Sequence, residues 1–306
     1  MDVSVFEYLY GKDISHDGIS SFDGYSWKRS LWTLYNSFFS YLEERLVILI
    51  SGVLSYFITS FLAYYLIVFF LKANRGFIHH IRSCRRVLLI TAHPDDECMF
   101  FGPVILQLIK ESCNVYLLCL SEGNYDGKGA LRKDELWKSC NILGIPESNI
   151  FLCRNSQLSD DPKMRWKKSV LSPIILSHIE IFQCDTVVTF DQSGVSGHVN
   201  HRAIFFSLCD IIDSNKLPSY CKVYFLETVN LLRKYSSFAD TFLSFILSSC
   251  WYSVNFQESQ QLKEAMKAHK SQFVWFRKLY LLFSRYVFIN TLRASDSLDL
   301  CFDFED

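Results

Sequence analysis

The chain has 306 residues, of which 50% are hydrophobic, 16% aromatic and 21% charged, and its formal net charge is -1. This composition excludes a disordered chain, because such a chain could not bury enough apolar surface to become ordered. A pI of about 6.7 gives no basic field, so we expect no nucleic-acid partner. The mean hydropathy of +0.12 is high for a water-soluble chain and points to a membrane segment.

The strongest feature near the N-terminus is an uncharged apolar run at residues 46–71. At about 1.5 Å per residue, a helix of this length exceeds the roughly 30 Å hydrocarbon layer of a bilayer. A buried core helix is the alternative, but core helices are rarely so long and so uniformly apolar. The run also starts too far from the N-terminus for a cleavable signal peptide. We therefore predict one transmembrane helix at 46–71, preceded by a tail at 1–45.

The flanking charges predict how this helix is oriented. Arg45 alone directly precedes the run, whereas five cations follow it closely: Lys72, Arg75, Arg82, Arg85 and Arg86. Positive flanks remain on the cytoplasmic side. We thus expect a basic linker at 72–85 and a cytosolic domain at 86–306, with the tail in the lumen or outside. Eleven cysteines without a CxxC or a paired spacing fit a reducing compartment.

Beyond the linker, short apolar runs alternate with helical patterns. We predict strands at 86–91, 115–120, 150–152, 186–190 and 222–226, and helices at 99–112, 131–143, 166–179 and 201–212. Such alternation is typical of βαβ units and predicts a Rossmann-like, three-layer α/β domain with a mostly parallel sheet. The C-terminal third is less regular. Residues 273–289 fit either a basic amphipathic helix on the bilayer or a core helix.

The first predicted strand continues directly into A-H-P-D-D-E, residues 92–97. Ligands of parallel α/β sheets bind outside the carboxyl ends of the strands, where this turn should lie. Pro94 ends the strand, and His93, Asp95 and Asp96 cluster around it. Adjacent side chains diverge, so one aspartate can face a metal and the other a water. The simpler alternative is that one aspartate only caps the next helix.

A second cluster follows the predicted strand at 186–190, in D-Q-S-G-V-S-G-H-V-N-H, residues 191–201. His198 and His201 are three residues apart and would share one face at the start of a helix. Two histidines and a carboxylate from the two loops would form the three-ligand site of a zinc hydrolase, with one position left for water. Zinc lowers the pKa of such a water to about 7. A carboxylate and a histidine that are not ligands could then act as base and oxyanion partner.

Together with S-E-G-N-Y-D-G-K-G-A-L-R-K-D-E-L at 121–136, these motifs resemble the PIG-L/LmbE-like family of zinc-dependent de-N-acetylases. The resemblance covers roughly 86–230, with a further A-H-K-S-Q stretch at 268–272. The chain is most similar to the family's eukaryotic branch. The resemblance implies removal of the N-acetyl group of N-acetylglucosaminyl-phosphatidylinositol, the second step of GPI-anchor biosynthesis. It also implies a single-pass protein of the endoplasmic reticulum membrane whose catalytic domain faces the cytosol.

The resemblance further implies roles for single residues. The zinc ligands would be His93, Asp96 and His201. Asp95 would be the general base, and His198 would assist at the carbonyl oxygen or the leaving amine. The implied substrate-binding residues are Arg132, Asn124, Asp126, His269 and Gln272. Arg132 could equally be a surface helix cation. Many bacterial members have G-H-P-D-H where this chain has G-H-V-N-H, and both histidines survive the change.

Two other functions stay open at this point. The same chemistry could act on another GlcNAc conjugate, or the fold could serve as a non-catalytic membrane adaptor. Packing alone, however, does not need three histidines and two aspartates on two separate loops. The nitrogen and oxygen ligands would also accept Fe²⁺, Mn²⁺ or Co²⁺ in place of Zn²⁺.

Overall fold

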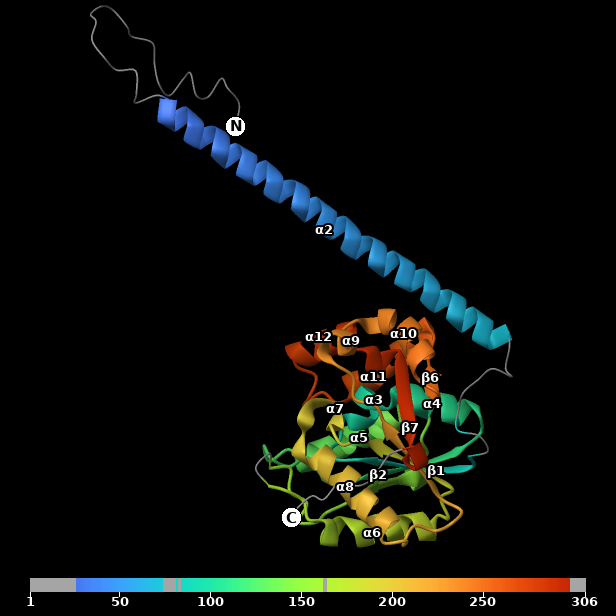
Figure 1. Ribbon diagram of the computed structural model, residues 1–306. Helices are drawn as coiled ribbons and strands as arrows, with labels where there is room; N and C mark the ends of the chain where they lie inside the picture. Colours follow the sequence, from blue (N-terminus) through green and yellow to red (C-terminus); the bar gives the residue numbers. More distant parts are fainter. Residues whose placement is uncertain (1–25, 74–80, 82–83, 162–163, 298–306) are drawn as a thin grey trace, which may run out of the picture. The chain divides into compact units, whose positions relative to one another are not determined.

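The computed structural model describes residues 26–73, 81, 84–161 and 164–297 (Figure 1). The chain forms two compact units, residues 1–56 and 57–306, and each is described by itself. The first 25 residues of the predicted tail and most of the predicted linker lie outside the described residues. The predicted domain boundaries therefore stay predictions.

The first element of the described residues is helix α2, Ser26–Ala73, of 48 residues. Within it, Arg29–Leu66 is long and apolar enough to cross a membrane, and its most apolar window is not buried in the protein. The predicted span at 46–71 falls inside this helix. The helix starts earlier than predicted because residues 26–45 contain neither glycine nor proline and therefore nothing that would end it.

The larger unit is built on a seven-stranded sheet of order β3-β2-β1-β4-β5-β7-β6. The strands are β1 Arg86–Thr91, β2 Asn114–Cys119, β3 Ile150–Leu152, β4 Thr186–Phe190, β5 Lys222–Leu226, β6 Trp251–Ser253 and β7 Ile289–Ala294. The first five strands are parallel, whereas β7 is antiparallel to both β5 and β6. The predicted fold, with its mostly parallel sheet, is confirmed.

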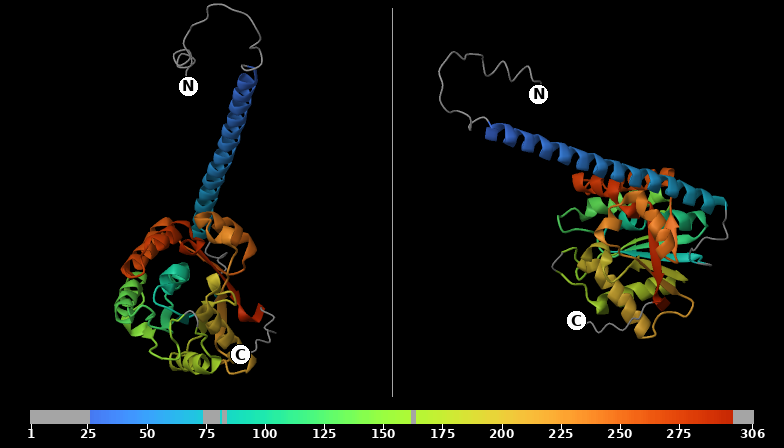
Figure 2. Two further views of the ribbon diagram at one scale, coloured as in Figure 1. Left: turned by 90° about the vertical axis from the view of Figure 1, so that its left-hand side faces the viewer. Right: turned by 45° about the horizontal axis from the view of Figure 1, so that its top comes forward.

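Helices cover both faces of this sheet (Figures 1 and 2). On one face α6, Lys168–Ile181, packs on α8, Val199–Asp213. The opposite face carries α3 Asp96–Phe100, α4 Gly102–Lys110, α5 Gly129–Leu143 and α11 Phe256–Ala268. Because β1 and β4 are covered on both sides, all of their residues except Arg86 are buried, which explains their uninterrupted apolar sequences.

The remaining elements are short. They are α7 Gly194–Gly197, α9 Leu231–Lys234, α10 Asp240–Leu247 and α12 Trp275–Phe283, and the 3₁₀ helices η2 Glu147–Asn149, η3 Ser237–Ala239, η4 Arg285–Val287 and η5 Ser295–Ser297. Two predicted helices differ from the structure. The one at 99–112 is divided between α3 and α4, because Pro103 starts a new helix after Phe101. The one at 273–289 is the shorter α12, followed by η4 and β7.

The strand order places the two sequence motifs side by side. From β1 the chain moves outward to β2 and β3, and then returns to β4 on the other side of β1. A parallel sheet binds its ligands outside the carboxyl ends of the strands at such a reversal. β1 ends directly before A-H-P-D-D-E, and β4 ends directly before the loop that carries the two histidines.

Candidate active site

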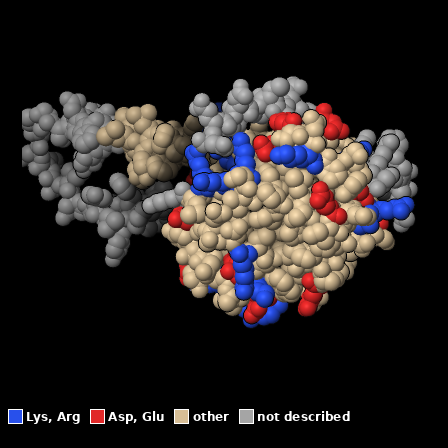
Figure 3. Space-filling model, turned by 90° about the horizontal axis from the view of Figure 1, so that it is seen from below, with Lys and Arg blue, Asp and Glu red and all other residues tan. Residues whose placement is uncertain are grey.

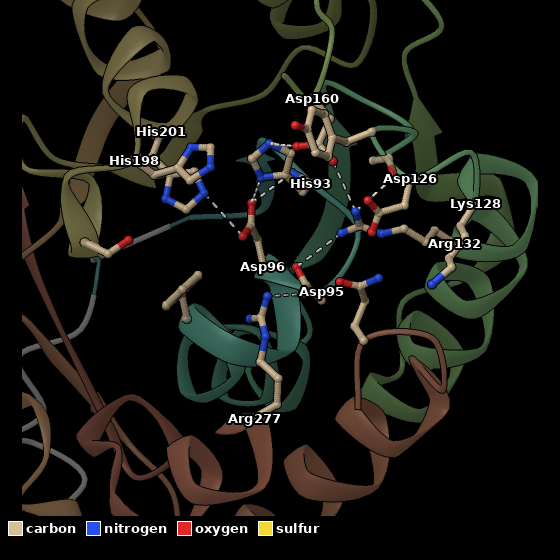
Figure 4. A pocket seen from close by; sticks show the side chains of 15 residues that line it. His93, Asp95, Asp96, Asp126, Lys128, Arg132, Asp160, His198, His201 and Arg277 are labelled. Carbon is tan, nitrogen blue, oxygen red and sulfur yellow. Dashed lines mark hydrogen bonds and ion pairs between the residues drawn. The ribbon is translucent and has the colours of Figure 1, made fainter. Parts of the chain in front are cut away.

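The motifs line a cavity of about 340 Å³ at the carboxyl edge of the sheet (Figure 4). This volume lies within the range of about 300–1,000 Å³ that is typical of small-molecule sites. The lining residues are His93, Asp95, Asp96, Phe100, Gly123, Tyr125, Asp126, Lys128, Arg132, Asp160, Ser196, His198, His201, Gln272 and Arg277. Eight of the ten predicted site residues are among them, and the exceptions are Asn124 and His269.

The turn after β1 fixes two carboxylates. Asp95 has a φ of 115°, which is rare for a non-glycine residue, and its N–H donates to Glu97 Oε2 at 3.0 Å. Asp96 Oδ2 accepts hydrogen bonds from the N–H groups of Ala92 (3.0 Å) and His93 (2.8 Å). Asp96 Oδ1 is left directed toward the second motif, on the far side of the cavity.

His201 is held by its surroundings with one ring nitrogen free for a ligand. Its Nδ1 lies 3.0 Å from the carbonyl of Gly194, and its ring stacks on Phe190 at a centroid distance of 3.9 Å. A donating Nδ1 leaves the lone pair on Nε2, which makes no hydrogen bond and lies 3.4 Å from Asp96 Oδ1. Gly194, at φ +56°, cannot be replaced easily, since an added Cβ would lie 2.8 Å from the His201 Cβ.

His93 faces the same point from the first motif. Its Nε2 lies 2.8 Å from Asp160 Oδ1 and 3.1 Å from the amide nitrogen of Asn200. Its other ring nitrogen, Nδ1, lies 3.8 Å from Asp96 Oδ2. If Nε2 donates to Asp160, the lone pair of His93 is on Nδ1, on the side of Asp96. A metal-binding histidine is usually supported in this way, by a carboxylate that accepts from its other ring nitrogen.

The charged groups of this cluster shift one another's pKa values. Burial alone would lower the pKa of His93, but the hydrogen bond to Asp160 and the charge of Asp96 outweigh it, and the pKa is raised. Burial alone would raise the pKa of Asp96, but His201 and then His93 lower it. Nitrogen and oxygen atoms from His93, Asp96 and His201 thus fit a zinc site with an open position. The ligand nitrogens of these two histidines and His198 lie within 4.8 Å of one another.

His198 has a different environment from the other two histidines. It is the N-cap of α8, with its side-chain Nδ1 accepting from the N–H of Asn200 at 3.3 Å. Burial, with the nearby rings of His93 and His201, lowers the pKa of His198 to about 4. The ring is therefore neutral at pH 7. Because Nδ1 accepts, its proton is on Nε2, the atom that can donate a hydrogen bond in the cavity.

Two arginines flank Asp95. Arg277 Nη2 lies 3.1 Å from Asp95 Oδ2, and Arg132 Nη2 lies 3.8 Å from Asp95 Oδ1. Arg132 is buried, so the alternative of a surface cation is wrong. Its guanidinium donates to the carbonyls of Pro94 (2.7 Å) and Gly123 (3.0 Å), and so ties the loops after β1 and β2 together.

Two of the predicted substrate-binding residues, His269 and Asn124, do not line the cavity. His269 is fully buried behind the cavity, where its Nε2 lies 2.7 Å from Glu97 Oε1. Asn124 turns its Oδ1 away from the cavity to accept the N–H of Gly129 at 2.8 Å, at the start of α5. Neither side chain lines the cavity, so both support the site from behind.

Asp160 and Arg277 line the cavity but were not predicted from the sequence. Asp160 follows β3, so the rule that ligands bind at the carboxyl ends of parallel strands could have identified it. Arg277 lies on α12, more than 180 residues after Asp95, and no pattern in the sequence connects the two. Tyr125 and Lys128 lie inside the recognised segment at 121–136, but that segment alone assigned them no role.

Comparison with known proteins gives concordant results. Residues 88–212 match the family described as PIG-L: GlcNAc-PI de-N-acetylase. A Bos taurus protein named N-acetylglucosaminyl-phosphatidylinositol de-N-acetylase is 46% identical over 208 residues, covering 68% of this chain and 82% of the relative. The Saccharomyces cerevisiae protein of the same name is 28% identical, covering 66% of this chain and 79% of the relative. N,N'-diacetylchitobiose deacetylase from Pyrococcus horikoshii shares the fold, with a TM-score of 0.51 and 18% identity over 70% of this chain and 84% of that structure.

Proposed function

Because the chain belongs to the PIG-L family of GlcNAc-PI de-N-acetylases, and is a hydrolytic deacetylase, we propose that its substrate is N-acetylglucosaminyl-phosphatidylinositol. The products are acetate and glucosaminyl-phosphatidylinositol, in the second step of GPI-anchor biosynthesis. The observation that carries this proposal is the convergence of His93, Asp96 and His201 beside Asp95 in one cavity. The coverage of most of the bovine relative, rather than of a fragment, supports transfer of the substrate.

The proposed metal ligands are His93, Asp96 and His201, and the proposed metal is Zn²⁺. A zinc ion supplies Lewis-acid activation of water and polarises the amide carbonyl. The protein's part is to hold the three side chains in place. The carbonyl of Gly194 and the Asp160 carboxylate fix the two rings, and the backbone N–H groups of the first turn fix Asp96.

Asp95 is the proposed general base. It takes a proton from the attacking water as the new C–O bond forms, and returns it to the nitrogen as the C–N bond breaks. The strained backbone and the hydrogen bond to Glu97 fix where its carboxylate lies. His198, neutral and with its proton on Nε2, donates to the oxygen that becomes negative in the tetrahedral intermediate.

The cavity rim supplies groups for a phosphorylated sugar. Lys128 and Arg277 are cations suited to the phosphodiester, and Asp126 and Gln272 can bond to sugar hydroxyls. We assign these four residues to substrate binding, together with Arg132, which also orders the loops. The apolar helix α2 would anchor the enzyme in the endoplasmic reticulum membrane, where a lipid-linked sugar is confined.

The test is acetate release by the full chain, reconstituted in vesicles that contain the proposed substrate. Asp95→Asn should retain bound zinc and lose activity by about 100-fold or more, since general bases contribute about 10²–10⁴-fold. His201→Ala should lose both zinc and activity. Asp134→Asn, an exposed α5 residue outside the cavity, is the matched control and should behave as the parent.

Two results would overturn the proposal. An Asp95→Asn variant as active as the parent would show that Asp95 is not the general base, and would rule out the proposed mechanism. Faster deacetylation of a soluble GlcNAc conjugate than of the lipid-linked sugar would remove the proposed substrate while leaving the chemistry intact.

A further inference from the structure

The helices α9, α10 and α12 lie at one end of the larger unit (Figure 1). All three carry large apolar side chains that are exposed. Five of the eight residues of α10 and five of the nine of α12 are large apolar side chains that are at least 40% exposed. α9 begins with Leu231 and Leu232, which are 71% and 86% exposed. We call these exposed side chains of the three helices the apolar face.

The three helices form one surface. The hydroxyl of Ser237, in η3, donates to the carbonyl of Leu282 on α12 at 3.2 Å. The rings of Tyr235, directly after α9, and Tyr280 of α12 meet edge to face at 6.4 Å. Since η3 leads directly into α10, the exposed side chains are neighbours in space. Monomers in water rarely expose apolar patches larger than a few hundred square ångströms.

Two charged groups on these helices, Asp240 and Lys234, are buried beneath the apolar face, whereas Lys278 of α12 is exposed. Asp240 of α10 is buried, with its carboxylate 2.7 Å from Arg233 Nε and 3.0 Å from Arg285 Nε. Lys234 is also buried, and its Nζ donates to the carbonyl of Val195 at 3.1 Å. A surface that faced water would gain by exposing these groups, since burial of charge is costly even when the charge is paired.

A lipid bilayer is the partner that this surface fits. The last part of α2, which belongs to the same unit, contacts Phe238 with the rings of Phe61 (5.6 Å) and Tyr64 (6.1 Å). Phe238 lies in η3, two residues before α10, so the part of α2 that belongs to this unit packs beside the apolar face, and this part includes the end of the segment that is apolar enough to cross a membrane. We propose that the apolar face rests in the bilayer surface, at the level of the headgroups and upper acyl chains.

This placement brings the cavity to the membrane. Arg277 of α12 lines the cavity, whereas Trp275 and Phe276 of the same helix are exposed on the apolar face. Under the proposed function, on which this step rests, the sugar of the substrate reaches the cavity while its acyl chains stay in the bilayer. α12 then separates the polar site from lipid.

Photocrosslinking tests the contact directly. A benzophenone amino acid replaces Leu232, Ile246 or Trp275 in the full chain, reconstituted in phosphatidylcholine vesicles with a radiolabelled phosphatidylcholine tracer. The matched control is Ile181 of α6, which is 69% exposed at the opposite end, where Figure 3 shows charged side chains of both signs. Lipid adducts are expected at the three positions and not at Ile181. Equal labelling of Ile181, absence of lipid adducts, or crosslinks to a second copy of the chain would overturn the inference.

Deacetylation rates on a membrane-bound and on a water-soluble substrate distinguish the membrane contact from the proposed function. The triple variant Leu232→Ser, Ile246→Ser and Trp275→Ser should deacetylate substrate in vesicles about tenfold more slowly, because a serine contributes little apolar burial in the membrane. Its rate on a short-chain, water-soluble analogue should match the parent, as should that of Ile181→Ser on both substrates. Equal rates of parent and triple variant in vesicles would overturn the membrane contact. A parent inactive on both substrates, but labelled by lipid, would overturn only the proposed function.

Discussion

At the scale of single residues, the site depends on a buried pair behind it. Glu97 Oε1 receives the Ser139 hydroxyl at 2.5 Å and lies 2.7 Å from His269 Nε2, while Oε2 accepts the N–H of Asp95. Burial alone would raise the pKa of Glu97, but the His269 charge and hydrogen bond lower it. The pair therefore holds the strained backbone of Asp95, whose φ is 115°, in place.

We predict that His269→Leu lowers kcat by about 10–100-fold with little change in KM, as is usual when a supporting hydrogen bond is removed. Zinc content should stay at the parent level, because the His269 side chain bonds to Glu97, which is not one of the proposed ligands. His269→Gln, which keeps a donor, should recover part of the rate. The measurements are kcat and KM on the vesicle substrate and metal per chain.

The opposite kinetic pattern would support the role that the sequence first indicated. A raised KM with unchanged kcat would mean that His269 contacts the substrate directly. A loss of zinc together with activity would mean that the pair supports the metal ligands rather than Asp95.

The residues predicted from the sequence are those that lie in short motifs at strand ends. His93, Asp95, Asp96, His198 and His201 can be located in this way because local sequence and parallel topology together determine where they lie. His269 lies in an equally recognisable motif, yet only the packing of α11 reveals that its side chain is buried. Arg277 could not be predicted, because its contact with Asp95 depends on how the C-terminal helices fold back.

At the scale of elements, the loop between β2 and α5 requires glycine for two separate reasons. Gly123 and Gly127 both have a positive φ, +64° and +71°. A Cβ on Gly123 would lie 2.3 Å from the Arg132 guanidinium, whereas a Cβ on Gly127 would meet nothing within 4 Å. The two glycines therefore separate the cost of backbone strain from that of displacing Arg132.

We predict that Gly127→Ala destabilises the protein by about 1–2 kcal/mol, the usual cost of a left-handed residue. Gly123→Ala should cost about 2–3 kcal/mol more, because buried hydrogen bonds of Arg132 to Pro94 and Gly123 are broken. It should also reduce activity, since Arg132 holds the turn that carries Asp95. Thermal unfolding in detergent and acetate release provide the two measurements. Equal melting temperatures for the two variants would contradict the proposed role of Arg132.

The parallel strands were predictable, but the antiparallel ones were not. β1 and β4 form apolar runs because helices cover both of their faces. β7 includes Asn290, Thr291 and Arg293, and β6 has only three residues, so neither has a clear strand pattern. Asn290 is buried because its amide donates to the carbonyl of Phe100 and its oxygen accepts from Val104, a contact that no local pattern predicts.

At the scale of the whole molecule, α12 links the cavity to the apolar face. α12 lines the cavity with one side chain and carries the apolar face with others, and the last part of α2 contacts the same unit beside η3. Under the proposed membrane contact, the cavity therefore lies close to the bilayer, on the side where the catalytic unit is. The positive residues after the apolar run predict that this side is the cytosol.

Glycosylation mapping tests this orientation, because the chain contains no N-x-S/T sequence of its own. Asp13→Asn creates one in the tail, and Gln157→Thr creates one in an exposed turn of the catalytic unit. Only lumenal sites receive the glycan. We predict that, in microsomes, Asp13→Asn gains a mass shift sensitive to endoglycosidase, whereas Gln157→Thr does not. The reverse result would place the cavity in the lumen, and the cations that follow the apolar run would then not determine its orientation.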